Sequence, residues 1–186
     1  MTPFARAAQE AAASHALDRR DRELVEMAQE ATARAYAPYS LFAVGAAVRS
    51  NSEAIYAAAN LENASFGLTI CAEAAALSLA NSMGDPEIEA IAVVGFDFTR
   101  SADASGIVAP CGSCRQLIAE AAQRANCNVR VICCNARLDS IVISTITELL
   151  PNAFGSETLL GRPQWAELHR ELRASVERLI ATRKTQ

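Results

Sequence analysis

The sequence has no block of basic residues and no long apolar run. Its 17 Lys and Arg residues stand against 21 Asp and Glu residues, which gives a formal net charge of −4. Lys and Arg also form no stripe with interleaved aromatic side chains, and both observations argue against a nucleic acid partner. No apolar run reaches the length of a membrane span, and the N-terminal stretch lacks the hydrophobic segment of a signal peptide. The sequence therefore predicts a cytoplasmic protein that binds neither nucleic acid nor membranes.

Internal repeats and low-complexity linkers are also absent, and a length of 186 residues suits one domain. Hydrophobic residues make up 51% of the chain, although alanine supplies much of this fraction. A chain of this length and composition can bury a core of useful size. We therefore expect a single domain over residues 1–186.

Hydrophobic periodicity predicts that helices and strands alternate along the chain. Helices are expected over residues 19–36, 71–83 and 111–124, and strands over residues 42–48, 54–60, 88–96, 129–134 and 138–146. The first two strands are expected to form a hairpin. Strands joined through helices are typical of a mixed sheet with helices on both faces, so the sequence predicts an α/β fold. From Trp165 onward, apolar residues at helical spacing predict an amphipathic helix that packs on its own domain or on a partner subunit.

Histidine is scarce, with only His15 and His169, whereas cysteine occurs six times. In a reducing compartment, cysteines serve as core residues, metal ligands or catalytic groups more often than they form disulfides. Cys127, Cys133 and Cys134 lie in or near a predicted buried strand. We expect these three to pack as small hydrophobic residues.

The other three cysteines occur in two short motifs, Cys71-Ala72-Glu73 and Pro110-Cys111-Gly112-Ser113-Cys114, each at the predicted start of a helix. The N-terminus of a helix lowers the pKa of a cysteine and so favours the thiolate that zinc binds. Cys111 and Cys114 are three residues apart and therefore share a helix face. Cys71 and Glu73 reach a common point only if both lie in the first turn, with the metal beyond the helix end. Three thiolates leave the fourth zinc position open, which is typical of a catalytic site.

Each motif alone allows another interpretation. A single Cys-x-x-Cys in a cytosolic α/β protein can be a redox pair, and a single Glu on a helix is usually a solvated surface residue. A structural zinc site lacks an obvious fourth ligand, because both histidines lie in the terminal extensions. The combination favours catalytic zinc, because a Cys two residues before a Glu, followed by Pro-Cys-x-x-Cys, matches the signature of zinc-dependent nucleoside and nucleobase deaminases.

Four segments resemble the motifs of the cytidine deaminase family, in the family's order. They are residues 36–47 (YAPYSLFAVGAA), 60–73 (NLENASFGLTICAE), 110–116 (PCGSCRQ) and 149–155 (LLPNAFG). The likeness spans a core of roughly residues 22–160, between an N-terminal extension and the C-terminal amphipathic helix. The resemblance implies a three-layer α/β/α sandwich around a five-stranded mixed sheet. It also implies a homotetramer, because Cys71 stands where the dimeric branch of the family has His.

The resemblance further implies a zinc site and its chemistry. Cys71, Cys111 and Cys114 would bind Zn²⁺, and Glu73 would act as the proton shuttle. Glu73 would take a proton from the water that attacks carbon 4 of the cytosine ring. It would then protonate the ring nitrogen and the departing amine, which gives uridine and ammonia.

The substrate-binding residues are likewise implied by the resemblance. Asn60 and Glu62 would bind the ribose hydroxyls, and Phe42 would line the pyrimidine pocket. Backbone groups around Ala72 and Cys111 would contact the amino group of the base. Phe154 would reach the base in a neighbouring subunit's site. The alternatives are that Phe42 and Phe154 are ordinary core residues, and that Asn60 and Glu62 are turn residues that cap the following segment.

The residue after Glu73 departs from the family's pattern. The three-cysteine branch commonly has Arg there, which helps to neutralise the thiolates, whereas this chain has Ala74. Arg115 is one candidate for the missing cation. Alternatively, position 74 faces a pocket enlarged for an unusual substrate, because blasticidin S deaminases also lack that Arg.

The sequence therefore predicts a deaminase of cytidine and 2′-deoxycytidine that acts in pyrimidine salvage. A deaminase for a modified aminopyrimidine nucleoside such as blasticidin S is the alternative within the same class. A non-catalytic zinc-binding protein with the deaminase fold, and a redox protein that uses Cys111 and Cys114, are alternatives from other classes.

Overall fold

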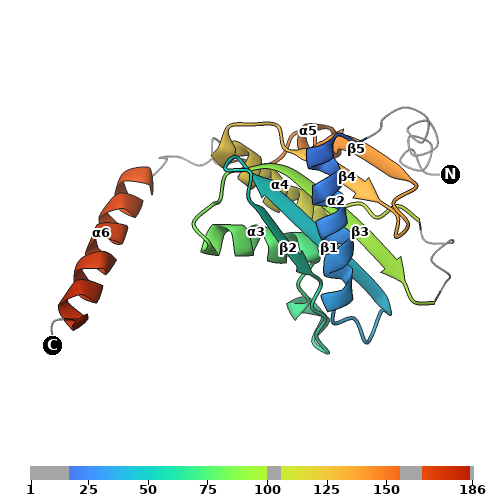
Figure 1. The fold of residues 1–186 in the computed structure, drawn as a ribbon, viewed down its shortest axis with the longest axis horizontal. Helices are drawn as coiled ribbons and strands as arrows, with labels where there is room; N and C mark the ends of the chain where they lie inside the picture. Colours follow the sequence, from blue (N-terminus) through green and yellow to red (C-terminus); the bar gives the residue numbers. More distant parts are fainter. Residues whose placement is uncertain (1–16, 100–105, 156–164, 185–186) are drawn as a thin grey trace. The chain divides into compact units, whose positions relative to one another are not determined.

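The structure is a computed structural model that describes residues 17–99, 106–155 and 165–184 (Figure 1). It divides into two compact units, Met1–Ala153 and Phe154–Gln186, each of which is described by itself. The expectation about a signal peptide falls on residues 1–16, which lie outside the described residues. The last part of the region that resembles the cytidine deaminases, residues 156–160, lies outside them as well.

The first unit is built on a five-stranded sheet in the order β2-β1-β3-β4-β5. The strands are β1 (Phe42–Ser50), β2 (Ile55–Ala59), β3 (Ile88–Asp97), β4 (Arg130–Cys134) and β5 (Ile141–Thr145). β3 and β4 run parallel, and the other neighbouring pairs run antiparallel. A parallel pair requires a crossover connection, which a helix supplies here. The sheet is therefore mixed, as the sequence predicts.

Helices cover both faces of this sheet (Figure 1). α2 (Arg19–Ala31) lies on one face, and α3 (Ala72–Ser82) and α4 (Gly112–Ala125) lie on the other. The core under α2 includes Leu24 and Val25, whereas α3 and α4 contribute mainly alanines, together with Ile118, to the core on the other face. The small alanine side chains let the two helices approach the sheet closely. The predicted three-layer α/β/α arrangement is confirmed.

Two glycines make close approaches between layers possible. A Cβ atom at Gly45 of β1 would lie 2.0 Å from the carbonyl oxygen of Ala28 on α2. A Cβ atom at Gly95 of β3 would lie 2.2 Å from Cγ2 of Val108 and 2.9 Å from Cε1 of Phe42. Any larger residue would therefore displace α2 at the first position, and the Val108 side chain and the Phe42 ring at the second.

A network of ion pairs around the buried Arg49 and Asp21 attaches α2 to the sheet. Arg49 of β1 donates to Asp21 of α2 at 3.0 Å and to Glu89 of β3 at 2.5 Å. Asp21 also accepts from Nε of Arg130 on β4, at 2.8 Å. Buried charges are tolerated only when they are paired and hydrogen-bonded. The network therefore fixes α2 relative to three strands at once.

The first predicted helix is shorter than expected. α2 ends at Ala31, and the chain continues as the 3₁₀ helix η1 (Thr32–Arg34). The hydroxyl group of Thr32 donates to the carbonyl oxygen of Gln29 at 2.7 Å. A side chain that bonds to the backbone in this way competes with the regular helix and accounts for its end.

The last predicted strand begins later than expected and is followed by a helix that the hydrophobic pattern does not predict. Leu138 has a φ of 61°, which interrupts an extended chain, so β5 begins only at Ile141. The additional helix is α5 (Ile146–Leu149). Its sequence signal is a capping box formed by Thr145 and Glu148.

The second unit contains α6 (Trp165–Lys184), the amphipathic helix that the apolar spacing predicts. Its apolar side chains, among them Leu168, Leu172 and Leu179, are exposed. Their packing on a domain or a partner subunit stays a prediction. Within the described residues, no helix combines the length and the apolar character that crossing a membrane requires.

Candidate metal centre

The starts of α3 and α4 bring three thiols together. Cys71 is the N-cap residue of α3, Cys111 is the N-cap residue of α4, and Cys114 lies in the first turn of α4. The side chain of Cys71 forms no capping hydrogen bond to its own helix. The Sγ atoms of all three residues lie within 4.8 Å of one another. The local structure therefore leaves these sulfur atoms available for a shared partner.

This donor set fits a zinc ion. Tetrahedral Zn–S bonds of about 2.3 Å place sulfur atoms about 3.8 Å apart, and the observed limit of 4.8 Å is compatible with that spacing. Among the side chains that the structure describes, these cysteines form the one group of three or more His, Cys, Asp or Glu residues able to hold a metal. A tetrahedral ion held by three thiolates keeps one position for another ligand, as catalytic zinc sites do.

The three thiols differ in exposure and in acidity. Cys114 is buried, Cys71 is half-buried and Cys111 is exposed. Burial raises the pKa of Cys114, and the negative charge of Glu73 raises it further. Burial also raises the pKa of Cys71. At Cys111 burial acts in the same direction, but hydrogen bonds from the Cys114 N–H group and from neighbouring thiols outweigh it and lower the pKa. A bound cation favours the thiolate at all three positions.

Glu73 lies in the first turn of α3 beside these thiols. Its side chain is only 4% exposed, so it is not a solvated surface residue. Burial raises the pKa of this carboxyl group, while its own N–H group and a hydrogen bond with Cys114 lower it. A buried carboxyl group with a raised pKa is suited to taking up and releasing a proton.

Phe42 and Ala72 both lie in the layer that contains the thiols. Phe42 begins β1 and shares the sheet face of Val44 and Ala46, because alternate residues of a strand point the same way. Its ring lies against Gly95. Ala72 is the first residue of α3 and is fully buried. Their contacts with a substrate stay predictions.

Asn60 is bound to the backbone of β1. Its Oδ1 accepts from the Val44 N–H group at 2.9 Å, and its Nδ2 donates to the carbonyl oxygen of Phe42 at 3.1 Å. One amide therefore pairs with backbone groups of both Phe42 and Val44 near the start of β1. These contacts are made to the strand before Asn60 in the sequence, whereas the alternative expects a turn residue that caps the following segment. The binding of a ribose by Asn60 stays a prediction.

Glu62 binds the loop that precedes β1. Its Oε2 accepts from the N–H group of Tyr39 at 2.9 Å and from that of Ser40 at 3.3 Å. A hydrogen bond from the Ser40 side chain and these two N–H groups lower the pKa of Glu62, against the effect of burial. Glu62 is therefore a carboxylate that orders the loop leading to Phe42. The sequence pattern does not indicate this contact, because Glu62 lies 23 positions after Tyr39 and 22 positions after Ser40.

Ala74 lies in a groove between α3 and α4. The groove has a volume of about 320 Å³ and is also lined by Leu77 and Leu117. Neither the thiols nor Glu73 line this groove, so it does not test the explanation that position 74 faces a pocket enlarged for an unusual substrate. Both explanations of Ala74 stay predictions.

Phe154 belongs to the second unit, where it is 59% exposed. Its predicted role in a neighbouring subunit's site stays a prediction.

The three cysteines expected in the core are placed as predicted. Cys133 and Cys134 are buried in β4, and Sγ of the half-buried Cys127 donates to the carbonyl oxygen of Ile88 at 3.3 Å.

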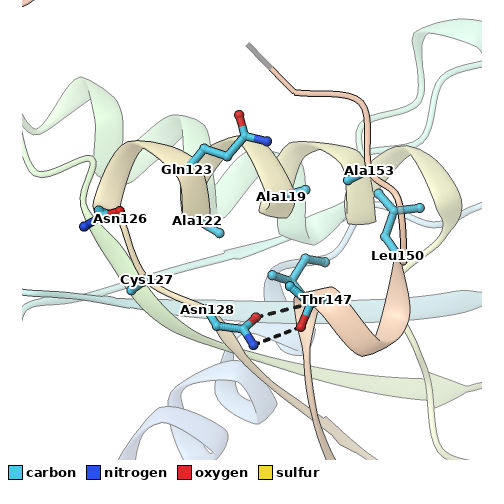
Figure 2. A pocket seen from close by; sticks show the side chains of 10 residues that line it. Ala119, Ala122, Gln123, Asn126, Cys127, Asn128, Thr147, Leu150 and Ala153 are labelled. Atoms are coloured by element: carbon cyan, nitrogen blue, oxygen red, sulfur yellow. Dashed lines mark hydrogen bonds between the residues drawn. The ribbon is translucent and has the colours of Figure 1, made fainter. Parts of the chain in front are cut away.

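Figure 2 shows a further cavity, of about 370 Å³, between α4 and the segment around α5. Ala119 and Ala122 form part of its apolar wall. Asn128 and Thr147 line it as well and are joined by two hydrogen bonds. None of the residues predicted for the site lines this cavity.

Comparison with known proteins decides the family. Residues 18–134 match the family model for the cytidine and deoxycytidylate deaminase zinc-binding region. A cytidine deaminase from Halalkalibacterium halodurans is 43% identical over 136 residues, which cover 73% of this chain and 95% of that protein. The chain belongs to the cytidine deaminase family. It is therefore an enzyme of that family, as its motifs predict.

Other relatives agree with this assignment, and one of them is named for a substrate other than cytidine. A crystal structure of cytidine deaminase from Burkholderia pseudomallei matches 72% of this chain and 98% of its own, with 40% identity and a TM-score of 0.62. A blasticidin-S deaminase from Bacillus cereus is 36% identical over 136 residues, covering 73% of this chain and 92% of that protein.

Proposed function

We propose that this enzyme is a zinc-dependent deaminase that converts cytidine and 2′-deoxycytidine to uridine and 2′-deoxyuridine with release of ammonia. The observation that carries the proposal is the convergence of Cys71, Cys111 and Cys114 at two helix starts, with the buried Glu73 beside them. The match to a zinc-binding deaminase region supports zinc as the metal. Such an enzyme would act in pyrimidine salvage in the cytoplasm.

The roles of the chain's own residues follow from their chemistry. The three thiolates would hold zinc, and the ion, when bound, would supply the Lewis acidity that makes a water molecule acidic near neutral pH. Glu73 accepts the proton from that water as it attacks carbon 4 of the base. Glu73 donates that proton to the ring nitrogen, takes up a second proton from the new hydroxyl group on carbon 4 and donates it to the departing amine, so that one water molecule is consumed as uridine and ammonia form. Because Glu73 is buried, its proton affinity is higher than that of a solvated carboxylate.

A screen for ammonia release tests this function. Zinc-loaded protein is incubated with cytidine, 2′-deoxycytidine, cytosine and blasticidin S, and a Glu73→Gln sample serves as the blank. Ammonia from the two cytosine nucleosides supports the proposal. Ammonia from blasticidin S alone would replace it with the second candidate, which the 36% identical relative and Ala74 favour. No release from any substrate by fully zinc-loaded protein would indicate a non-catalytic member of the fold.

Glu62→Ala is expected to raise KM for cytidine by about tenfold or more, the effect of losing a hydrogen bond to a charged group. Free cytosine has no ribose, so its kcat/KM, if it is accepted, should change little. Steady-state kinetics on both substrates check this expectation.

The matched control is Glu62→Gln, which keeps an oxygen acceptor for the N–H groups of Tyr39 and Ser40. If Glu62→Ala impairs both substrates equally and Glu62→Gln restores both, Glu62 acts only by ordering the loop before β1.

We also infer that the active species is a homotetramer. Large apolar side chains are exposed on connected segments of the first unit, namely Tyr36, Tyr39, Leu61, Phe66, Leu68 and Ile70. Bridges join Tyr36 to Leu61 and Leu61 to Ile70, and the rings of Tyr39 and Phe66 pack edge to face at 5.8 Å. Exposed apolar patches of this kind mark protein interfaces. The same segments carry Asn60 and Glu62, so a subunit bound here would lie next to the site.

Mixing two inactive variants is expected to restore activity if Phe154 completes a neighbouring subunit's site. One chain carries Phe154→Ala, and the other carries Glu73→Ala. After random subunit exchange, about a quarter of the sites combine an intact Glu73 with an intact Phe154 from a neighbour. Cytidine turnover of the mixture is compared with that of each variant alone.

Native mass spectrometry with one isotope-labelled variant verifies exchange. Proven exchange without recovery would place Phe154 in the site of its own chain or outside any site.

A further inference from the structure

Arg115 connects the metal-binding loop to a distant segment of the chain. Its Nε donates to the carbonyl oxygen of Pro110 at 2.9 Å, and its Nη1 donates to the carbonyl oxygen of Leu149 at 3.0 Å. Pro110 directly precedes the thiol residue Cys111, whereas Leu149 lies 34 positions after Arg115 and ends α5. A single half-buried side chain therefore joins the start of α4 to the end of α5.

Cys111 needs such support more than the other two thiols. It is the exposed thiol of the three, so packing by neighbouring side chains holds it least. The position of its sulfur atom therefore depends mainly on the backbone on either side. Pro110 is fully buried and has a fixed φ, and the peptide group that joins it to Cys111 contains the carbonyl held by Arg115. The backbone N–H group of Arg115 also bonds to the carbonyl oxygen of Cys111, at 2.9 Å.

The other end of the contact is a favourable place for a cation. The last carbonyl groups of a helix have no partner within the helix and carry partial negative charge. α5 has four residues, and Arg115 supplies a partner for its final carbonyl group. The planar guanidinium presents several N–H groups at fixed angles, so it can bind two carbonyl groups at once. A lysine ammonium group carries the same charge but lacks this geometry.

We propose that Arg115 is a positioning residue that orients Cys111 for the metal by fixing the Pro110 carbonyl group against the end of α5. This inference rests on the proposed zinc site. It differs from a purely electrostatic role, in which the charge of Arg115 compensates for Ala74 by neutralising thiolates. A positioning role and a purely electrostatic role predict different zinc affinities for Arg115→Lys.

Zinc affinity is the first test, measured by competition with a chromophoric chelator in the absence of substrate. Arg115→Ala and Arg115→Lys are both expected to bind zinc about 10- to 100-fold more weakly, as residues that orient metal ligands typically do. Arg124→Ala is the matched control, because Arg124 is also on α4 but its Nη2 donates to Oδ1 of Asn81 at 3.1 Å. Its zinc affinity should stay within about twofold of that of the unchanged protein.

A double-mutant cycle with Cys111 tests whether Arg115 affects metal affinity through Cys111. If Arg115 acts through Cys111, then Arg115→Lys should change metal affinity by less than about twofold when Cys111→Ser is already present. Co²⁺ replaces zinc in these samples, because its thiolate charge-transfer band reports how many sulfur atoms bind. Arg115→Lys alone should weaken this band in the same direction as Cys111→Ser does.

Several outcomes would overturn the proposal. Full zinc affinity in Arg115→Lys, with a loss in Arg115→Ala, would show that charge and not position matters. An equal loss with and without Cys111→Ser would show that Arg115 does not act through Cys111. Lower thermal stability with unchanged metal affinity and Co²⁺ spectrum would leave Arg115 a merely structural role. Arg115→Lys keeps these tests decisive if Arg115→Ala does not fold. Failure of the unchanged protein to bind zinc would instead refute the proposed function.

Discussion

Glu73→Gln is expected to lower kcat for cytidine deamination by about 10²- to 10⁴-fold, the usual effect of removing a positioned acid or base. Gln has nearly the same shape as Glu and fits the same buried position, but it does not accept the proton from water. The three thiols are unchanged, so zinc content should remain at about one ion per chain. Steady-state kinetics and metal analysis on the same samples measure both quantities.

Glu120→Gln is the matched control for this substitution. Glu120 is exposed on α4, so the same chemical change there should leave kcat unaltered. Near-normal turnover by zinc-loaded Glu73→Gln would remove Glu73 from the mechanism. Loss of zinc from that variant would show that the carboxyl group supports the metal.

Cys114→Ser is expected to reduce bound zinc from about one ion per chain to almost none, because a serine hydroxyl group is a far weaker zinc ligand than a thiolate. Cys114 is the buried thiol of the cluster, and its first-turn position places it close to both other sulfur atoms. Cytidine deamination should be lost together with the metal. Metal analysis after gel filtration gives the zinc content directly.

Cys127→Ser provides the control. Cys127 is half-buried and bonds to the carbonyl oxygen of Ile88, so its replacement should leave zinc content unchanged. Full zinc content in Cys114→Ser would contradict the ligand set. If every cysteine variant, Cys127→Ser included, lost part of its zinc, the loss would indicate a general effect on folding.

The sheet was predictable because its strands carry strong local signals. β3 was expected over residues 88–96 and is observed over Ile88–Asp97, since a continuous apolar run is typical of a strand covered on both faces. The ends of other elements depend on single contacts that periodicity does not report. One example is the left-handed conformation of Leu138, and another is the Thr32 hydroxyl group bonded to the backbone.

The meeting of the three thiols was predictable for a similar reason. Each motif places its cysteines at the N-cap or in the first turn of a helix, and two such helix starts on one face of the sheet can meet. The contacts of Glu62 and Arg115 were not predictable, because each joins the side chain to backbone groups far away in sequence. Hydrogen bonds of this kind follow from the packing of whole elements and leave no periodic pattern in the residues themselves.

The most direct test of the central claim is uridine formation from cytidine as zinc is removed and restored. The protein is stripped with a chelator, zinc is added back in steps, and the initial rate of uridine formation is measured at each step. The rate should be near zero without metal and rise in proportion to zinc until about one ion is bound per chain. Uridine formation at the full rate by metal-free protein, or none by the fully zinc-loaded protein, would contradict the account.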